Sequence, residues 1–350
     1  MKKNFLFGVI TFFLSLLILM SMYSILIIPY KIYTNSARVT SSQNNNRFDE
    51  SYGYTLNKNL NSSINLKYIN RSYKVISDKN GARISEKNLR DNNDDHKILI
   101  IGDSLSFGYG LNYEDTFGYL LEKKLNTKIK NLSVPGYSTI QSYKVLKDKI
   151  NNEELVIYGF IEDHLRRNIS SCGPTSGIYC TIVPTARITK DKNVLITEKI
   201  LVNNFKLNQM YNKRLIERDY FQSKDLIYGF KYIKYSFLKR LGFYNVKYSD
   251  REKLIILKYI IDQMLEITEK NNANLLFVNI DISNKKKKIF NKISQMEFKN
   301  KVYFFDASPK NNQKISISDL LIKYDGHPNK KGHEYIKRKL EKYIKENSLL

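Results

Sequence analysis

Two short segments far apart in the chain carry the residue types of a nucleophilic site. In the first, Ser104 follows an uncharged strand-like run and a Gly-Asp dipeptide, and glycines punctuate the loop after it. In the second, Asp325 stands two residues before His327, one of only four histidines in the chain. A serine hydroxyl is a weak nucleophile until a base takes its proton, and a third group must orient that base. The sequence therefore predicts Ser104 as nucleophile, His327 as general base and Asp325 as the orienting carboxylate.

The glycines near Ser104 do not fit the other common glycine-rich sites. The segment lacks the Gly-Lys-Ser/Thr ending of a phosphate-binding loop, and Gly108-Tyr-Gly110 lacks the third glycine of a dinucleotide fingerprint. It also differs from the G-x-S-x-G elbow of α/β-hydrolases. Each segment alone has a structural explanation, an Asp-Ser turn in the first and a helix cap at Asn329 in the second. Their joint presence favours a catalytic site.

These motifs resemble those of the SGNH (GDSL-type) hydrolases, in the membrane-anchored bacterial form. The run GDSL at 102–105 is similar to the first block of the family, and DGHPN at 325–329 is similar to the last. NLSVPGYS at 131–138 resembles the second block. The resemblance covers about residues 96–345 and implies a three-layer α/β/α flavodoxin-like sandwich with a parallel sheet.

The same resemblance implies the roles of further groups. The backbone N–H groups of Ser104 and Gly136 would form an oxyanion hole, and the reaction would need no metal or other cofactor. The third block of the family normally adds an Asn side chain as a donor, but the residues after Gly159 read Phe-Ile-Glu-Asp-His-Leu. The nearby polar side chains that are candidates to replace it are His164, Arg167 and Asn168. Alternatively this segment is structural, with its acids paired to Arg166 or Arg167.

Alternating strand-like and helix-like runs in the second part of the chain would position the motifs. Short apolar runs predict strands at 97–102, 128–132, 154–160, 275–280 and 302–306. Apolar residues at helical spacing predict helices at 113–125, 251–269 and 332–344. Strands separated by helices of this length favour a parallel sheet covered on both faces. Ser104 would then lie at the carboxyl edge of the sheet, where reacting groups collect.

An uncharged run of 24 residues, 5–28, lies near the start of the chain behind two lysines. As a helix it would be about 36 Å long, which is enough to cross a bilayer core of ~30 Å. A cleaved signal peptide is the alternative, although its apolar run is usually shorter. We predict that residues 1–30 are a retained signal anchor, one transmembrane helix in the cytoplasmic membrane, with the catalytic domain on the extracytoplasmic side.

The rest of the chain divides into segments of different composition. Residues 31–95 are first polar and then contain short extended runs broken by turns, which predicts a stalk and a small β-containing segment. Residues 96–350 form the predicted hydrolase-like domain, with an insertion at about 185–250 that is basic and rich in Tyr and Phe. Cys172 and Cys180 flank a Gly/Pro/Ser loop, and both a disulfide and two free thiols remain open.

The composition excludes several classes of protein. A hydrophobic fraction of 42% excludes a disordered tail protein, and two cysteines exclude a disulfide-dense scaffold or a four-cysteine zinc site. The formal net charge of 58 − 34 = +24 suggests a nucleic-acid partner. The basic residues are spread along the chain, however, and the predicted compartment contains no nucleic acid. We therefore expect no nucleic-acid partner.

Together these features predict a serine esterase that works through an acyl-enzyme. Its location favours an O-acylated cell-surface glycan or a lipid-linked ester as substrate. Two alternatives remain open from sequence: a glycan O-acyltransferase that uses the same triad, and a non-catalytic relative that binds polysaccharide.

Overall fold

The computed structural model describes residues 7–19, 21–22, 39–43, 45–88, 95–170, 183–199, 248–283, 288–309 and 315–350. Residues 7–19 are helical. Within the described ranges, no helix combines the length and the apolar character needed to cross a membrane. Parts of the predicted anchor at 5–28, of the stalk and of the insertion at 185–250 lie outside the described residues, as does the pair Cys172 and Cys180.

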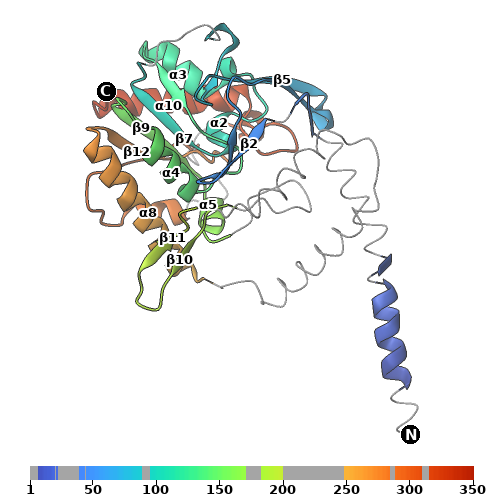
Figure 1. Cartoon of the computed structure of the whole chain (residues 1–350). Coiled ribbons are helices and arrows are strands. Elements are labelled where there is room, and N and C mark those ends of the chain that lie inside the picture. The colour runs from blue at the N-terminus through green and yellow to red at the C-terminus, as the bar shows by residue number, and fades with distance from the viewer. Residues whose placement is uncertain are drawn as a thin grey trace.

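A nine-stranded sheet forms the centre of the molecule (Figure 1). Five neighbouring strands are parallel, and their order in the sheet is β8 (Ile129–Asn131), β7 (Ile98–Gly102), β9 (Leu155–Phe160), β12 (Asn274–Asn279) and β13 (Tyr303–Asp306). Numbered along the chain this order is 2-1-3-4-5, as in flavodoxin-like folds. Each strand falls on a run that the sequence predicts as a strand, so the predicted α/β class with a mainly parallel sheet is confirmed.

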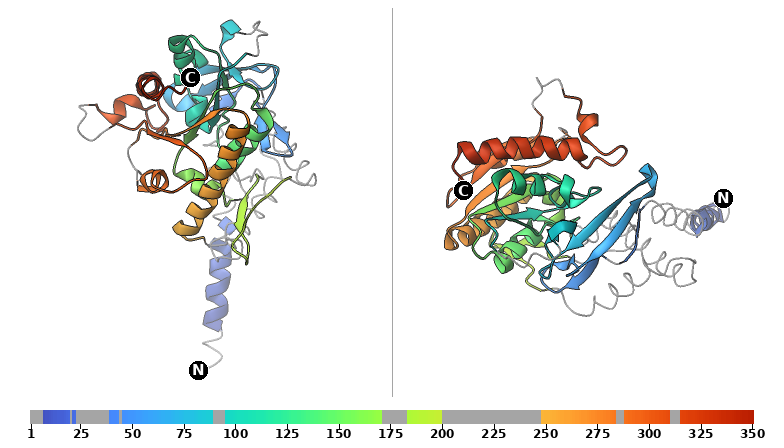
Figure 2. Two further views of the ribbon diagram at one scale, coloured as in Figure 1. Left: turned by 90° about the vertical axis from the view of Figure 1, so that its left-hand side faces the viewer. Right: turned by 90° about the horizontal axis from the view of Figure 1, so that it is seen from above.

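Helices cover both faces of the parallel strands (Figure 2). Because successive side chains in a strand point to opposite faces, Ile98 and Ile100 of β7 enter one apolar core and Leu99 and Ile101 the other. The first core is completed by α3 (Phe117–Leu125) and α10 (Lys330–Glu346). The second is completed by α4 (Thr139–Lys149), α8 (Asp250–Lys270) and α9 (Lys288–Ser294). The three predicted layers are therefore present.

The small β-containing segment predicted before the parallel strands packs against them and shares their sheet. Its strands continue the same sheet beyond β8 in antiparallel pairing, in the order β6 (Arg83–Ile84), β5 (Arg71–Ser77), β4 (Asn61–Leu66) and β1 (Val39–Ser41). The junction is one pair, Arg83 opposite Asn131. β4 alternates exposed and buried residues, so one of its faces adds to the core. We call the described residues of 39–88 the N-terminal extension.

Two small hairpins complete the described structure. In the extension, β2 (Asn46–Asp49) pairs with β3 (Gly53–Leu56). In the predicted insertion, β10 (Ala186–Ile188) pairs with β11 (Val194–Ile196).

Candidate active site

Ser104 is the first residue of a short helix, α2 (Ser104–Phe107), that begins directly after β7. Asp103 is the N-cap of this helix, and its Oδ1 accepts a hydrogen bond of 3.0 Å from the N–H of Leu105. A helix start leaves its first N–H groups without partners in the helix, and among the described residues no acceptor takes the N–H of Ser104. The strand-to-helix junction is tight, because a Cβ added at Gly159 would lie 1.9 Å from Oγ of Ser106.

His327 and Asp325 lie on the loop between the 3₁₀ helix η5 (Ile317–Leu320) and α10. The N–H of Ile322 donates to the carbonyl of His327 at 2.8 Å, which closes the loop into a tight turn. Gly326 has φ +88°, a conformation that strains other residues. After the turn, Oδ1 of Asn329 accepts from the N–H of Gly332 at 3.1 Å, so Asn329 caps α10 as its sequence context suggests.

The fold brings the two motifs into contact. Nε2 of His327 lies 2.8 Å from Oγ of Ser104, and Nδ1 of His327 is hydrogen-bonded to Oδ1 of Asp325. Burial alone would raise the pKa of Asp325, but its hydrogen bond with His327 and a second one with Tyr68 leave that pKa lowered. An ionised Asp325 accepts a hydrogen bond from Nδ1–H of His327. Nε2 therefore carries the lone pair that accepts the hydrogen bond of the Ser104 hydroxyl. The structure thus places the three predicted residues in the geometry of a Ser-His-Asp triad.

The loop that carries Gly136 is held beside the nucleophile. The N–H of Val134 donates to the carbonyl of Gly102 at 3.1 Å, at the end of the strand that leads to Ser104. The hydroxyl of Tyr54 donates to the carbonyl of Pro135 at 2.9 Å. In the described part of the chain no acceptor takes the N–H of Gly136. Its amide therefore remains available for the predicted role in an oxyanion hole.

The segment after β9 does not offer the expected replacement for the missing Asn. It forms α5 (Asp163–Arg167), and His164 is fully buried with Nδ1 2.7 Å from the hydroxyl of Tyr158 and Nε2 3.4 Å from Oδ2 of Asp103. Burial lowers the pKa of His164, so it is neutral near pH 7. Asn168 is also buried, and its amide is bonded to the first turn of α4. Neither side chain supports the prediction that it serves as an oxyanion donor.

Ion pairs dominate this segment, in agreement with the structural alternative. Arg166 and Arg167 both bind Asp163 at 2.8 Å. Arg167 also reaches Oδ2 of Asp103 at 3.0 Å and the carbonyl of Tyr137 at 2.9 Å. Burial alone would raise the pKa of Asp103, but His164, Arg167 and the capped N–H lower it to about 2. The residue beside the nucleophile is therefore a fixed carboxylate.

Three further residues contact the site but lie in no sequence motif that would have predicted this. Tyr68 donates its hydroxyl to Oδ2 of Asp325, from which it is separated by 257 residues. The ring of Tyr109 lies 4.7 Å from the ring of His327, measured between centroids. Arg83 is fully buried, and its guanidinium donates to carbonyls of the loop that follows α2, those of Phe107, Gly108 and Leu111. Tyr68 and Arg83 belong to the N-terminal extension.

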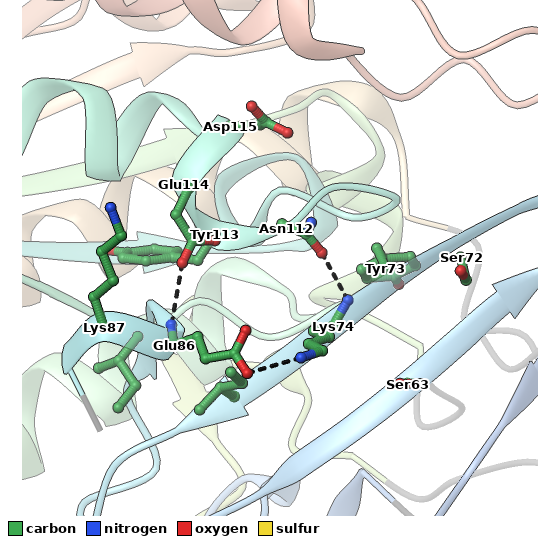
Figure 3. A pocket seen from close by; sticks show the side chains of 12 residues that line it. Ser63, Ser72, Tyr73, Lys74, Glu86, Lys87, Asn112, Tyr113, Glu114 and Asp115 are labelled. Atoms are coloured by element: carbon green, nitrogen blue, oxygen red, sulfur yellow. Dashed lines mark hydrogen bonds and ion pairs between the residues drawn. The ribbon is translucent and has the colours of Figure 1, made fainter. Parts of the chain in front are cut away.

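A separate cavity of about 790 Å³ lies over the extension (Figure 3). It is lined by Ser63, Ser72, Tyr73, Lys74, Ile76, Ile84, Glu86, Lys87, Asn112, Tyr113, Glu114 and Asp115. No triad residue lines it. Some of its polar groups bond one another, since Lys74 bonds Glu86 through Nζ and Asn112 through its N–H, each at 2.8 Å. We do not assign chemistry to this cavity.

Comparisons with known proteins give likeness of fold only. No protein-family model matches the chain, and no curated protein is similar to it. Among solved structures, it is similar to TesA, with 12% identity over 72% of this chain and 99% of the other and a TM-score of 0.38. It is also similar to a GDSL-like lipase from Bacteroides thetaiotaomicron, with 12% identity over 71% and 88% and a TM-score of 0.36. An acetyl xylan esterase from Butyrivibrio proteoclasticus is 12% identical over 72% and 64%, with a TM-score of 0.39. At these values the function must be argued from the site.

Proposed function

We propose that this chain is a serine ester hydrolase of SGNH type whose substrate is an O-acylated cell-surface glycan or a lipid-linked ester. The observation that carries the proposal is the contact of 2.8 Å between Oγ of Ser104 and Nε2 of His327, with Nδ1 of the same ring on Asp325. Ser104 is 8% exposed, while the side chains of His327 and Asp325 are 24% and 15% exposed. The triad is thus largely shielded from bulk water, and His327 is its most exposed member.

In the acylation step, Oγ of Ser104 attacks the ester carbonyl as its proton moves to Nε2 of His327. The new C–O bond gives a tetrahedral oxyanion, which the N–H groups of Ser104 and Gly136 would stabilise. Asp325 stabilises the imidazolium that forms. The C–O bond to the alcohol then breaks, and His327 returns the proton to the departing alcohol. The products of this step are the free alcohol and an acyl-enzyme.

In the second step, water attacks the acyl carbonyl and His327 takes its proton. A second oxyanion forms in the same place and collapses, which breaks the bond to Oγ of Ser104. His327 returns the proton to Ser104, and the carboxylic acid leaves. In this scheme only Ser104 and His327 exchange protons with the substrate, water and each other, while Asp325 stays ionised and the two backbone N–H groups only donate hydrogen bonds.

We propose further that the uncharged run 5–28 anchors the protein in the cytoplasmic membrane, with the triad on the extracytoplasmic side. Support comes from the length of the run and the lysines before it. Alkaline carbonate washing of membranes from expressing cells tests this proposal. The protein should stay in the pellet, and deletion of residues 5–28 should release it.

The esterase proposal is tested with the full-length protein in mild detergent. A fluorescent phosphonate should label Ser104 covalently, as peptide mapping would show, and a short-chain aryl ester should be hydrolysed. Ser104→Ala should abolish both signals, whereas Ser63→Ala, at an exposed serine of β4, should change neither. Absence of both labelling and turnover in the wild-type protein would exclude the esterase.

A further inference from the structure

We propose that Tyr68 is a positioning residue of the triad, which holds the second carboxylate oxygen of Asp325 and thereby sets the basicity of His327. This inference rests on the proposed esterase chemistry. It extends the triad to a chain of four side chains, in the order Ser104, His327, Asp325 and Tyr68. The fourth member comes from the N-terminal extension rather than from the parallel part of the sheet.

The two oxygens of Asp325 have different partners. Oδ1 accepts from Nδ1 of His327 and, at 3.3 Å, from the backbone N–H of the same residue. Oδ2 accepts from the hydroxyl of Tyr68. A carboxylate that is largely shielded from water needs donors on both oxygens, because an unpaired buried charge is costly. Tyr68 supplies the donor that water would otherwise have to supply, and it fixes the plane of the carboxylate.

The backbone around Tyr68 is well suited to hold a side chain in place. Tyr68 lies in the 3₁₀ turn η1 (Lys67–Ile69) that joins β4 to β5, and Asn70 closes the turn with φ +47°. The two strands pair in continuous antiparallel register from Asn61 opposite Ile76 to Leu66 opposite Arg71. A rigid hairpin of this kind presents the phenol at a fixed position relative to the sheet.

The proton of this hydrogen bond belongs to Tyr68. Burial and the neighbouring Asp325 raise the pKa of Tyr68, so the phenol stays protonated throughout the working range of an esterase. By sharing the negative charge of Asp325, the phenol reduces the stabilisation that this charge gives to protonated His327. Loss of the hydroxyl should therefore make His327 more basic. The other titratable groups near the pair are Tyr73, Tyr109 and His333.

Further contacts link the extension to His327 itself. The ring of Tyr73 meets Tyr109 edge to face at 5.8 Å, and Tyr109 in turn lies against His327. The extension therefore braces the imidazole from one side through Tyr73 and Tyr109. It braces the carboxylate from another side through Tyr68.

The first test replaces Tyr68 by Phe in the full-length protein. The chain offers a matched control, because Tyr52 makes the same type of bond, from its hydroxyl to Oδ2 of Asp148 at 2.6 Å, outside the triad. We expect Tyr68→Phe to lower kcat for an aryl ester by about tenfold to a hundredfold, the usual range for a hydrogen bond to a charged group, with little change in KM. The acid limb of the kcat/KM profile should move to higher pH. Tyr52→Phe should change neither kcat nor the profile.

The second test keeps the hydroxyl and changes its strength. Replacement of Tyr68 by 3-fluorotyrosine lowers the pKa of the phenol and makes it a stronger donor, so the acid limb should move to lower pH, opposite to Tyr68→Phe. This replacement removes no contact and remains informative if Tyr68→Phe is unstable. The role of Tyr68 would be overturned if the acid limb stayed at its wild-type pH both in Tyr68→Phe and in the 3-fluorotyrosine protein. It would also be overturned if Tyr52→Phe and Tyr68→Phe lost equal activity. In either case, labelling of Ser104 at the wild-type level would still uphold the esterase.

Discussion

The parallel strands and the antiparallel extension meet at one site but contribute to it differently. The parallel part carries the proposed reacting groups, Ser104 after β7 and His327 with Asp325 before α10. The extension carries no reacting group. It holds the others in place, through Tyr68 on Asp325 and Arg83 on the loop after α2.

This difference follows from how the two parts are built. In a parallel sheet the carboxyl ends of the strands lie along one edge, so motifs that are distant in sequence converge there without further help. An antiparallel extension adds strands at the side of the sheet, and its turns can reach over the loops at that edge. In the proposed esterase, the parallel part would therefore determine which reaction occurs, and the extension would determine how precisely the reacting groups are held.

The largest effect should follow a change in the parallel part. Asp325→Asn keeps the shape of the side chain but removes the charge that fixes the tautomer of His327, so kcat/KM for an aryl ester should fall on the order of 10³–10⁴-fold. Asp319→Asn, at an exposed position nearby in the chain, is the control and should keep full activity. If kcat/KM fell less than about tenfold in Asp325→Asn, Asp325 would not be the carboxylate that orients His327.

The next effect tests the extension as a support. Arg83→Met would leave the carbonyls of Phe107, Gly108 and Leu111 without their buried donor. Each lost partner of this kind costs about 1–3 kcal/mol, so we expect urea denaturation to show a loss of at least about 3 kcal/mol in the free energy of unfolding. Arg166→Met, at an exposed ion pair, should cost less than about 1 kcal/mol. Equal losses in the two variants would mean that the extension does not hold this loop.

A pH effect on stability should appear at the junction between strand and nucleophile. The folded pKa of Asp103 is about 2, below its unfolded value of 3.8, so the unfolded state binds protons more readily as the pH falls. This stabilisation is fully present above about pH 4 and is lost as the pH approaches about 2, on the order of 2 kcal/mol in all.

Unfolding free energies measured from pH 5 to pH 2 check this prediction. Asp103→Asn should flatten the pH dependence in that range by the contribution of this carboxylate, while Asp250→Asn, at the exposed start of α8, should change it less. A wild-type slope that survives in Asp103→Asn would assign the effect to other carboxylates.

The smallest expected effect comes from a hydrogen bond between the extension and the loop that carries Gly136. Tyr54→Phe removes the bond of 2.9 Å to the carbonyl of Pro135, next to Gly136, but leaves the backbone N–H in place. One neutral hydrogen bond is worth about 0.5–1.5 kcal/mol, so kcat should fall about twofold to tenfold while KM stays constant. Steady-state kinetics of Tyr54→Phe, with Tyr52→Phe as the control, would measure this fall in kcat. A change in KM alone would place Tyr54 in substrate binding instead.

Much of the parallel half could be predicted because its signals are local. An uninterrupted apolar run such as 98–101 has few options other than a buried strand, and the apolar spacing in 251–269 fits only a helix. The extension was harder to place, since its short extended runs predict strands but not which strands pair with them. The burial of His164 and Asn168 could not be predicted for a related reason, because polarity in the sequence does not show whether a side chain is exposed.

The sequence by itself indicated the candidate reacting groups, because Ser104, Asp325 and His327 stand in short motifs whose chemistry depends on residue type and close spacing. It also determined the order of strands and helices from which the parallel sheet follows. Only the tertiary structure decided that the extension joins this sheet, and that Tyr68 and Arg83 reach the site. Those contacts span up to 257 residues of chain, as between Tyr68 and Asp325, and depend on the register and twist of paired strands. No local pattern of residues encodes them.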